Sequence, residues 1–140
     1  MKNELAVLVL ACASISSAWA APLSPDNAKK LAIEALQVIN EIEPAGLIAA
    51  PKRIDQATWM RKFDAPILKI QSKWPSPLDE NNKAIEPYQT CIEAISTLDH
   101  FKGLRVKDIF PEDQENSRAQ YFNLKSRCEK SIKTGKVTPK

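Results

Sequence analysis

The sequence predicts a single all-α domain, a bundle of four to five helices with one inter-helix disulfide. Apolar residues recur at every third or fourth position in four separate segments, which is the period of an amphipathic helix. Helix-capping residues and prolines separate these segments. The short alternating stretch GLRVKDIF at 103–110 would have no partner strand, so we expect it to connect the last two helices.

Residues 1–20 have the anatomy of a secretory signal peptide. Lys2 supplies a positive charge, an apolar run follows from Leu5, and Ala18-Trp19-Ala20 is a small-x-small cleavage signature. The apolar run is shorter than the ~20 residues that span a bilayer, so we expect no transmembrane segment. We therefore expect a periplasmic or secreted protein, with a helical bundle domain at 21–134 and a flexible basic tail at 135–140.

The first predicted helix starts at SPDN, residues 24–27. Ser24 is a favourable N-cap, Pro25 suits the first helical position, and Asp26 suits the positive end of the helix dipole. We expect Pro44 to end this helix, because a proline cannot donate the next backbone hydrogen bond. Its expected buried stripe consists of Ala28, Leu31, Ala35, Leu36, Ile39 and Ile42.

The second predicted helix spans residues 54–74 and contains Pro66. A proline inside a helix removes a hydrogen bond and clashes with the preceding turn, so we expect either a kink near Ala65 or a split into two short helices. Pro75 and Pro77 end the segment. Its expected buried stripe consists of Trp59, Phe63, Ile67, Ile70 and Trp74.

Two further helices are expected, one that runs from about Pro87, or a few residues earlier, to Lys102, and one from about Pro111 onward. We expect Gly46, Gly103 and Gly135 to follow helix ends, because glycine adopts the left-handed conformation that closes a last turn. The apolar faces of these two helices carry Tyr88, Cys91, Ile92, Ile95 and Leu98 and, in the last helix, Tyr121, Leu124, Cys128 and Ile132.

Cys91 and Cys128 are predicted to form the disulfide. Both lie on apolar helix faces, and an exported chain meets oxidising surroundings in which paired cysteines are bonded. The bond would close a loop of about 38 residues, which is worth ~4 kcal/mol in the chain-entropy model. Two free buried thiols are the alternative. Cys12 lies in the signal peptide, where lipidation is an alternative to its removal by cleavage after Ala20.

No catalytic residue and no metal site is expected. A catalytic cysteine needs an activating base. The chain's single histidine, His100, is spaced from Cys91 so that the two point to opposite sides of a helix. A zinc site needs about four ligands at suitable spacing. The acidic pairs at 41–43, 79–80 and 112–115 fall at expected helix ends, where solvated carboxylates are ordinary.

No cofactor is expected either. His100 lies in the last turn of its predicted helix, where a histidine interacts favourably with the helix dipole. The alternative is a haem bundle with His100 and Met60 as axial ligands. Soluble helical cytochromes of the b type draw these ligands from the first and last helices, whereas here they would come from the second and third. The chain also has no C-x-x-C-H motif for covalent haem attachment.

Charge excludes one class of partner. The chain has 20 Lys+Arg against 17 Asp+Glu, a net charge of +3, which is too small for a nucleic-acid-binding surface. We therefore expect no nucleic acid as a partner. The chain also lacks a glycine-rich loop that would cradle a phosphate.

The segment EPAGLIAAPKR at 43–53 is apolar where an expected connection should be polar. Leu47 and Ile48 are followed by Lys52 and Arg53. The segment either tucks against the core or forms an apolar patch, rimmed by positive charge, that contacts a partner or a membrane surface. We take Leu47, Ile48, Lys52 and Arg53 as the candidate partner-binding residues.

These observations favour a binding protein over an enzyme. We expect an inhibitor or immunity-type protein that neutralises another protein in the cell envelope, such as a toxic hydrolase, and a homodimer is compatible with this reading. In size, export and helicity the chain resembles the helical periplasmic immunity proteins of type VI secretion amidases, although no motif carries the resemblance. One alternative is a small-ligand or haem carrier with a pocket lined by Trp59, Phe63 and Trp74. Another is an envelope stress chaperone.

Overall fold

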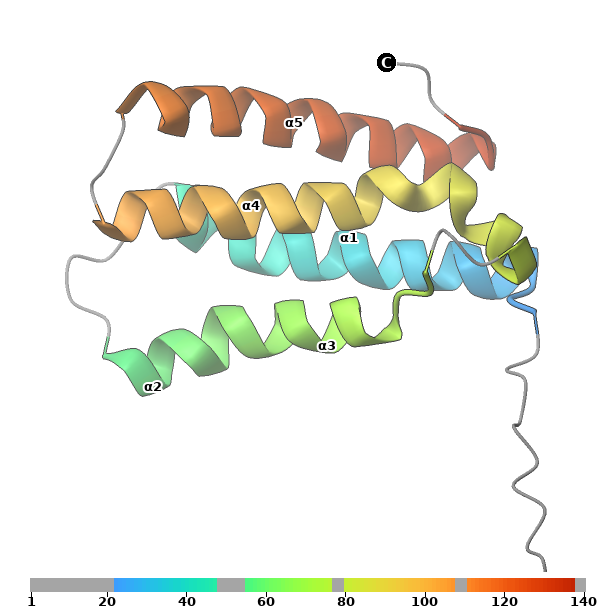
Figure 1. The fold of residues 1–140 in the computed structure, drawn as a ribbon, viewed down its shortest axis with the longest axis horizontal. Coiled ribbons are helices and arrows are strands. Elements are labelled where there is room, and N and C mark those ends of the chain that lie inside the picture. The colour runs from blue at the N-terminus through green and yellow to red at the C-terminus, as the bar shows by residue number, and fades with distance from the viewer. Residues whose placement is uncertain (1–21, 48–54, 77–79, 108–110, 138–140) are drawn as a thin grey trace, which may run out of the picture.

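The computed structural model describes residues 22–47, 55–76, 80–107 and 111–137, which form antiparallel helical rods (Figure 1). The first rod is α1 (Pro25–Leu47). The second joins α2 (Gln56–Trp59), the π-helix η1 (Met60–Asp64) and α3 (Ala65–Lys73). The third joins the 3₁₀-helix η2 (Glu80–Tyr88) to α4 (Gln89–Lys107), and the fourth is α5 (Pro111–Thr134). Each rod runs opposite to the one before it.

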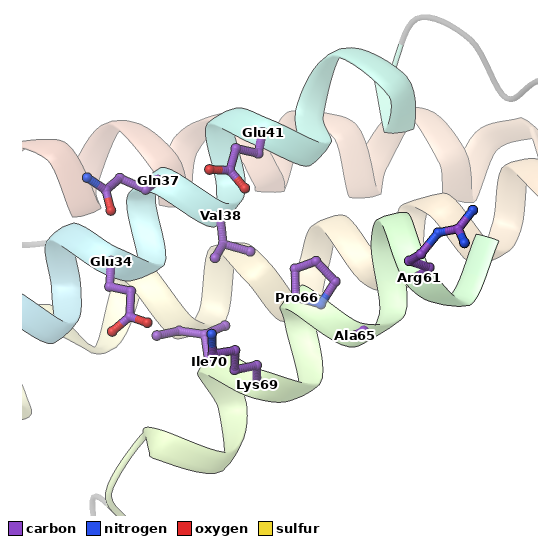
Figure 2. Close-up of a pocket in the computed structure, with 9 residues that line it drawn as sticks. All are labelled: Glu34, Gln37, Val38, Glu41, Arg61, Ala65, Pro66, Lys69 and Ile70. Carbon is purple, nitrogen blue, oxygen red and sulfur yellow. The ribbon is translucent and has the colours of Figure 1, made fainter. Parts of the chain in front are cut away.

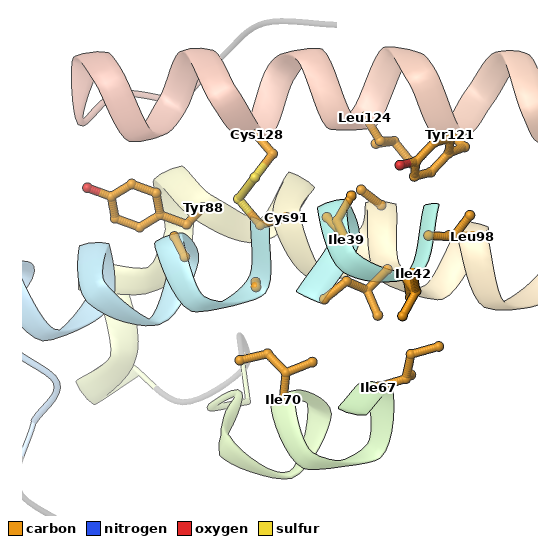
Figure 3. Close-up of a cluster of buried hydrophobic side chains, with 14 of the residues drawn as sticks. Ile39, Ile42, Ile67, Ile70, Tyr88, Cys91, Leu98, Tyr121, Leu124 and Cys128 are labelled. Atoms are coloured by element: carbon orange, nitrogen blue, oxygen red, sulfur yellow. A yellow bond between two sulfur atoms is a disulfide. The ribbon is translucent and has the colours of Figure 1, made fainter. Parts of the chain in front are cut away.

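One continuous core lies between the rods, which makes the chain a single all-α domain as the periodicity predicts. α4 packs most extensively on α5 and then on α1, and α1 also contacts α3, η2 and α5. Each of the four predicted stripes contributes fully buried side chains to this core (Figure 3). The largest of these side chains are Ile39, Ile67, Ile70, Ile95, Leu98 and Tyr121.

The disulfide between Cys91 and Cys128 is present, as predicted. It joins α4 to α5, with the two Cα atoms 4.7 Å apart, and both cysteines are fully buried. Figure 3 shows the bond crossing the space between the two helices, beside the apolar side chains of α1. The thiol of Cys91 is therefore not a nucleophile in this structure.

The first half of α1 packs through small side chains. Ser24 caps the helix as predicted, since its Oγ accepts a hydrogen bond from the backbone N–H of Asn27 at 3.2 Å. Ala28, Ala32 and Ala35 are fully buried behind this cap. Residues without long side chains allow a close approach between helices, so a larger side chain here must displace its neighbours.

We expect Ala32→Leu to lower the free energy of unfolding by about 1–3 kcal/mol, because the added carbons overpack a filled interior. Urea denaturation of the mature protein measures the change. The matched control is Ile33→Leu at the exposed neighbouring position, where a change within about 0.5 kcal/mol is expected. Equal stability of Ala32→Leu and the wild type would show that α1 has room at this position.

Two of the predicted helix ends are wrong. α1 continues through Pro44 and Gly46 to Leu47, and α4 continues through Gly103 to Lys107, so most of the expected connection at 103–110 is helical. A single glycine inside a helix costs only about 1 kcal/mol and cannot stop a long helix alone. Pro44 removes one hydrogen bond near the end of a helix that Ile39 and Ile42 already hold in the core. Gly135 alone matches the prediction: it has φ 66° and donates to the Ser131 carbonyl at the end of α5.

A π-helical turn accommodates Pro66. α2, η1 and α3 follow one another without a break, so no connection splits the segment into two helices, and the irregularity expected near Ala65 is a π-helical turn at Met60–Asp64. The Ala65 N–H donates to the carbonyl of Met60, five residues earlier, instead of to that of Arg61. This wider turn places the proline at the start of α3, where its missing N–H costs little. The rod therefore keeps Phe63, Ile67 and Ile70 on one buried face.

Candidate functional site

A surface groove of about 450 Å³ lies between α1 and the rod formed by η1 and α3 (Figure 2). α1 forms one wall, and η1 with α3 forms the other. The two rods are antiparallel, so Glu34 faces the end of the groove at Lys69 and Ile70, whereas Glu41 lies toward Pro66. The lining residues are Glu34, Gln37, Val38 and Glu41 on α1, and Arg61, Ala65, Pro66, Lys69 and Ile70 on the other rod.

Helical spacing gathers these residues on two facing walls. The α1 residues are three, four and seven positions apart, so they share one face of that helix, beside its buried stripe. On the opposite wall Arg61, Ala65 and Lys69 recur every four positions. Ala65 is exposed and small, and the ring of Pro66 is compact, so this wall has little side-chain bulk at its centre. We attribute the hollow to this pair.

The two walls carry opposite charges. α1 presents Glu34 and Glu41, and the facing rod presents Arg61 and Lys69. Glu34 forms an ion pair with Lys73 in the last turn of α3, and both side chains are partly exposed, so the pair contributes little stability. Within the described residues, Glu41, Arg61 and Lys69 form no ion pair. Of the four charged side chains that line the groove, Glu41, Arg61 and Lys69 are thus available to a binding partner.

Val38, Pro66 and Ile70 supply the apolar part of the groove. Ile70 is fully buried, so its side chain lies at the base of the hollow, whereas Val38 and Pro66 are half-buried. Ile33 and Leu68 are exposed on the same two rods but do not line the groove.

A second polar cluster joins the end of α1 to α5. Glu43 accepts a hydrogen bond from the Tyr121 hydroxyl, with 2.6 Å between the oxygens, and forms an ion pair with Lys125. Tyr121 is fully buried, and the side chains of Glu43 and Lys125 are 22% and 18% exposed. Sequence reasoning placed Glu43 among solvated carboxylates at a helix end. That prediction is wrong for Glu43, because α1 continues past it and packs it against α5.

The cluster changes two pKa values. Burial raises the pKa of the Glu43 carboxyl, but the hydrogen bonds from Lys125 and Tyr121 and the charge of Lys125 together outweigh burial, so the pKa is lowered. Burial, followed by the hydrogen bond to Glu43 and its negative charge, raises the pKa of Tyr121 well above its usual value. Glu43 is therefore a carboxylate and Tyr121 a neutral donor at neutral pH, which suits a structural role.

The partner-binding residues predicted from sequence stay largely untested. Leu47 ends α1, but Ile48, Lys52 and Arg53 lie outside the described residues. The groove was missed at the sequence level. Its signals were present in the charged pair at Glu34 and Glu41 and in the Ala65-Pro66 pair, but the sequence does not tell which helix faces which.

The aromatic residues expected to line a ligand pocket belong to the core. Phe63 is 3% exposed, and its ring contacts that of Trp59 with centroids 4.7 Å apart. Trp59 and Trp74 are partly buried against the core cluster, and none of the three lines the groove. The alternative haem ligands, Met60 and His100, are both exposed.

The described residues contain neither a candidate metal site nor a helix suited to crossing a membrane. No group of three or more His, Cys, Asp or Glu side chains is placed to hold a metal ion there. None of the described helices has the length and hydropathy that crossing a membrane requires. Comparison with protein-family models, with curated proteins and with solved structures found no match to this chain.

Proposed function

We propose that this chain is an exported binding protein of the inhibitor or immunity type. It neutralises a partner protein in the cell envelope, and the groove between α1 and α3 is its binding surface. The observation that carries the proposal is the groove itself. It combines an apolar centre with charges of both signs that form no ion pair within the described residues.

These properties fit a protein partner. Protein interfaces have an apolar, water-excluding centre and a polar rim that sets specificity. Here the centre is Val38, Pro66 and Ile70, and the rim includes Glu41 and Arg61. The signal-peptide anatomy of residues 1–20 supports a partner outside the cytosol.

A small-ligand carrier is the second candidate, and the size of the groove favours it. A volume of about 450 Å³ is within the range of small-molecule sites. Such sites are usually enclosed and mostly apolar, whereas five of the nine residues that line the groove are charged or amide side chains. We therefore rank the carrier below the protein-binding function.

The test is affinity capture from an envelope extract of the native host with three baits. These are the mature disulfide-bonded protein, the double variant Arg61→Glu/Lys69→Glu, and the control Lys29→Glu/Lys30→Glu. The control makes the same charge change at exposed positions of α1 outside the groove. Matching melting temperatures establish that all three baits are folded.

We expect the wild type and the control to retain one protein stoichiometrically, and the groove variant to retain at least about ten-fold less. One molar equivalent of the wild type should abolish the captured protein's enzymatic activity. Equal capture by all three baits would show that the groove is not the binding surface. A captured protein that stays fully active would contradict the inhibitor function.

A further inference from the structure

We infer that the segment held in the groove is an α-helix of the partner protein. It has an apolar ridge, basic side chains along the edge that faces α1, and acidic side chains along the edge that faces η1 and α3. This inference rests on the proposed function, which assigns the groove to a protein partner, and it adds the conformation and charge pattern of the bound segment.

The spacing of the charges on the walls matches a helix. Glu34 and Glu41 are seven residues apart on α1, which corresponds to about 10.5 Å along the axis. A bound helix that lies along the groove repeats side chains on one line at the same seven-residue interval, so it stays in register with Glu41 and with Glu34, which Lys73 already pairs. An extended strand repeats its same-face side chains every ~6.6 Å, which matches the spacing of the two carboxylates less well.

Backbone hydrogen bonding also disfavours a strand. A bound strand gains most of its affinity from main-chain hydrogen bonds to an exposed sheet edge. Both walls here are helical rods, so neither presents the row of backbone donors and acceptors that a sheet edge offers. The groove therefore offers a binding segment mainly side chains, which is how a helix binds in a groove.

Charge complementarity sets the direction of the bound helix. Glu34 is already paired with Lys73, so Glu41 is the carboxylate most available to a partner's cation. Across the groove, Arg61 and Lys69 are both exposed and available to carboxylates. Reversing the helix would bring like charges together on both sides, so only one direction satisfies the two walls at once.

A second copy of this chain fits the groove less well. A two-fold axis through the groove would pair the acidic wall of each copy with the basic wall of the other. It would also place one hollow over another hollow and leave the apolar centre unfilled. Unfilled apolar space forfeits the packing that an interface needs. The groove requires a convex occupant, and a helix with an apolar ridge is convex.

The test uses three synthetic helical peptides of two heptads with the same leucine ridge. One carries lysines on one edge and glutamates on the other, one carries lysines on both edges, and one carries glutamates on both. Each is titrated by NMR to about 1 mM, which detects affinities down to the millimolar range. The targets are the wild type, Arg61→Glu/Lys69→Glu, and the control Lys29→Glu/Lys30→Glu.

We expect the split-charge peptide to bind the wild type and the control at least about ten-fold more tightly than either uniform peptide. Shifts should be confined to residues around Val38, Pro66 and Ile70. With the groove variant, whose walls are both acidic, the peptide with lysines on both edges should become the tightest binder. Failure of all three peptides to bind the wild type, equal affinities, or shifts elsewhere would overturn the inference.

The capture experiment separates failure of this inference from failure of the proposed function. If the peptides fail but Arg61→Glu/Lys69→Glu still abolishes capture of the partner, the groove binds a non-helical element and only the inference is wrong. If capture is insensitive to the variant, the proposed function is wrong as well. A dimer of the wild type in sedimentation equilibrium that the groove variant abolishes would show that a second copy covers the groove, which also overturns the inference.

Discussion

Replacing both cysteines, as Cys91→Ala and Cys128→Ala, should lower the free energy of unfolding by about 2–4 kcal/mol. The bond joins positions 37 residues apart in sequence, and loss of the cross-link restores the entropy of that loop to the unfolded chain. For a domain of this size each kcal/mol corresponds to about 4 °C in melting temperature, so a decrease of about 8–16 °C is expected. Calorimetry and urea denaturation of the mature protein measure both quantities.

The wild type reduced in denaturant and refolded with its thiols blocked from oxidation is the matched comparison. It keeps both sulfur atoms, so it separates loss of the bond from loss of side-chain volume in the core. We expect its stability to lie within about 1–2 kcal/mol of that of the double alanine variant, since the alanines add a small cavity term. A double alanine variant as stable as the oxidised wild type would contradict the entropic role of the bond.

Replacing Glu43 with glutamine should lower the free energy of unfolding by about 2–3 kcal/mol at neutral pH. The substitution keeps the shape of the side chain but removes its negative charge. That charge strengthens the hydrogen bond from the Tyr121 hydroxyl and forms the ion pair with Lys125. Both partners remain largely buried, so their lost interactions are not fully replaced by water. Urea denaturation at pH 7 measures the change.

The effect of Glu43→Gln should depend on pH in a defined direction. The pKa of Glu43 is lower in the folded protein than in the unfolded chain, where the pKa of a glutamate is about 4.3. The stability that its ionisation contributes is therefore fully present above that value and is lost as the pH falls through the folded pKa. The difference between wild type and variant should shrink steadily below about pH 5.

Glu41→Gln is the matched control for this experiment. Glu41 is exposed, two residues away on the same helix, so its replacement should change stability by less than about 0.5 kcal/mol at any pH. A difference between wild type and Glu43→Gln that stays constant down to pH 3 would show that the carboxylate contributes only packing.

The sequence was sufficient to predict the fold because its signals are local or pairwise. Period-3.6 stripes identified the buried faces, and all the residues predicted for them within the described segments are buried or partly buried. The disulfide was predictable because only one partner for Cys91 remained in the expected mature chain. Ser24 and Gly135 marked helix ends through hydrogen bonds within a single turn.

What could not be predicted depends on which helices meet. Pro44 and Gly103 carry a local signal to stop a helix, yet in both cases the structure continues the helix past the signal. The π-turn before Pro66 is a compromise between a local cost and keeping Phe63 and Ile67 on one side. The groove is the clearest case, because the residues of each wall form no recognisable sequence motif. They define a groove only once α1 packs beside α3.

The cross-link between α4 and α5 divides the bundle into parts of unequal stiffness. α4 and α5 are covalently joined and share the largest contact, whereas α3 is held by α1 and α4 without a covalent bond. We therefore expect the wall of the groove that carries Arg61 and Lys69 to be more compliant than the bonded pair of helices. Small displacements of that wall would change the width of the groove without disturbing the bonded pair, so we expect the groove to accept occupants of different width.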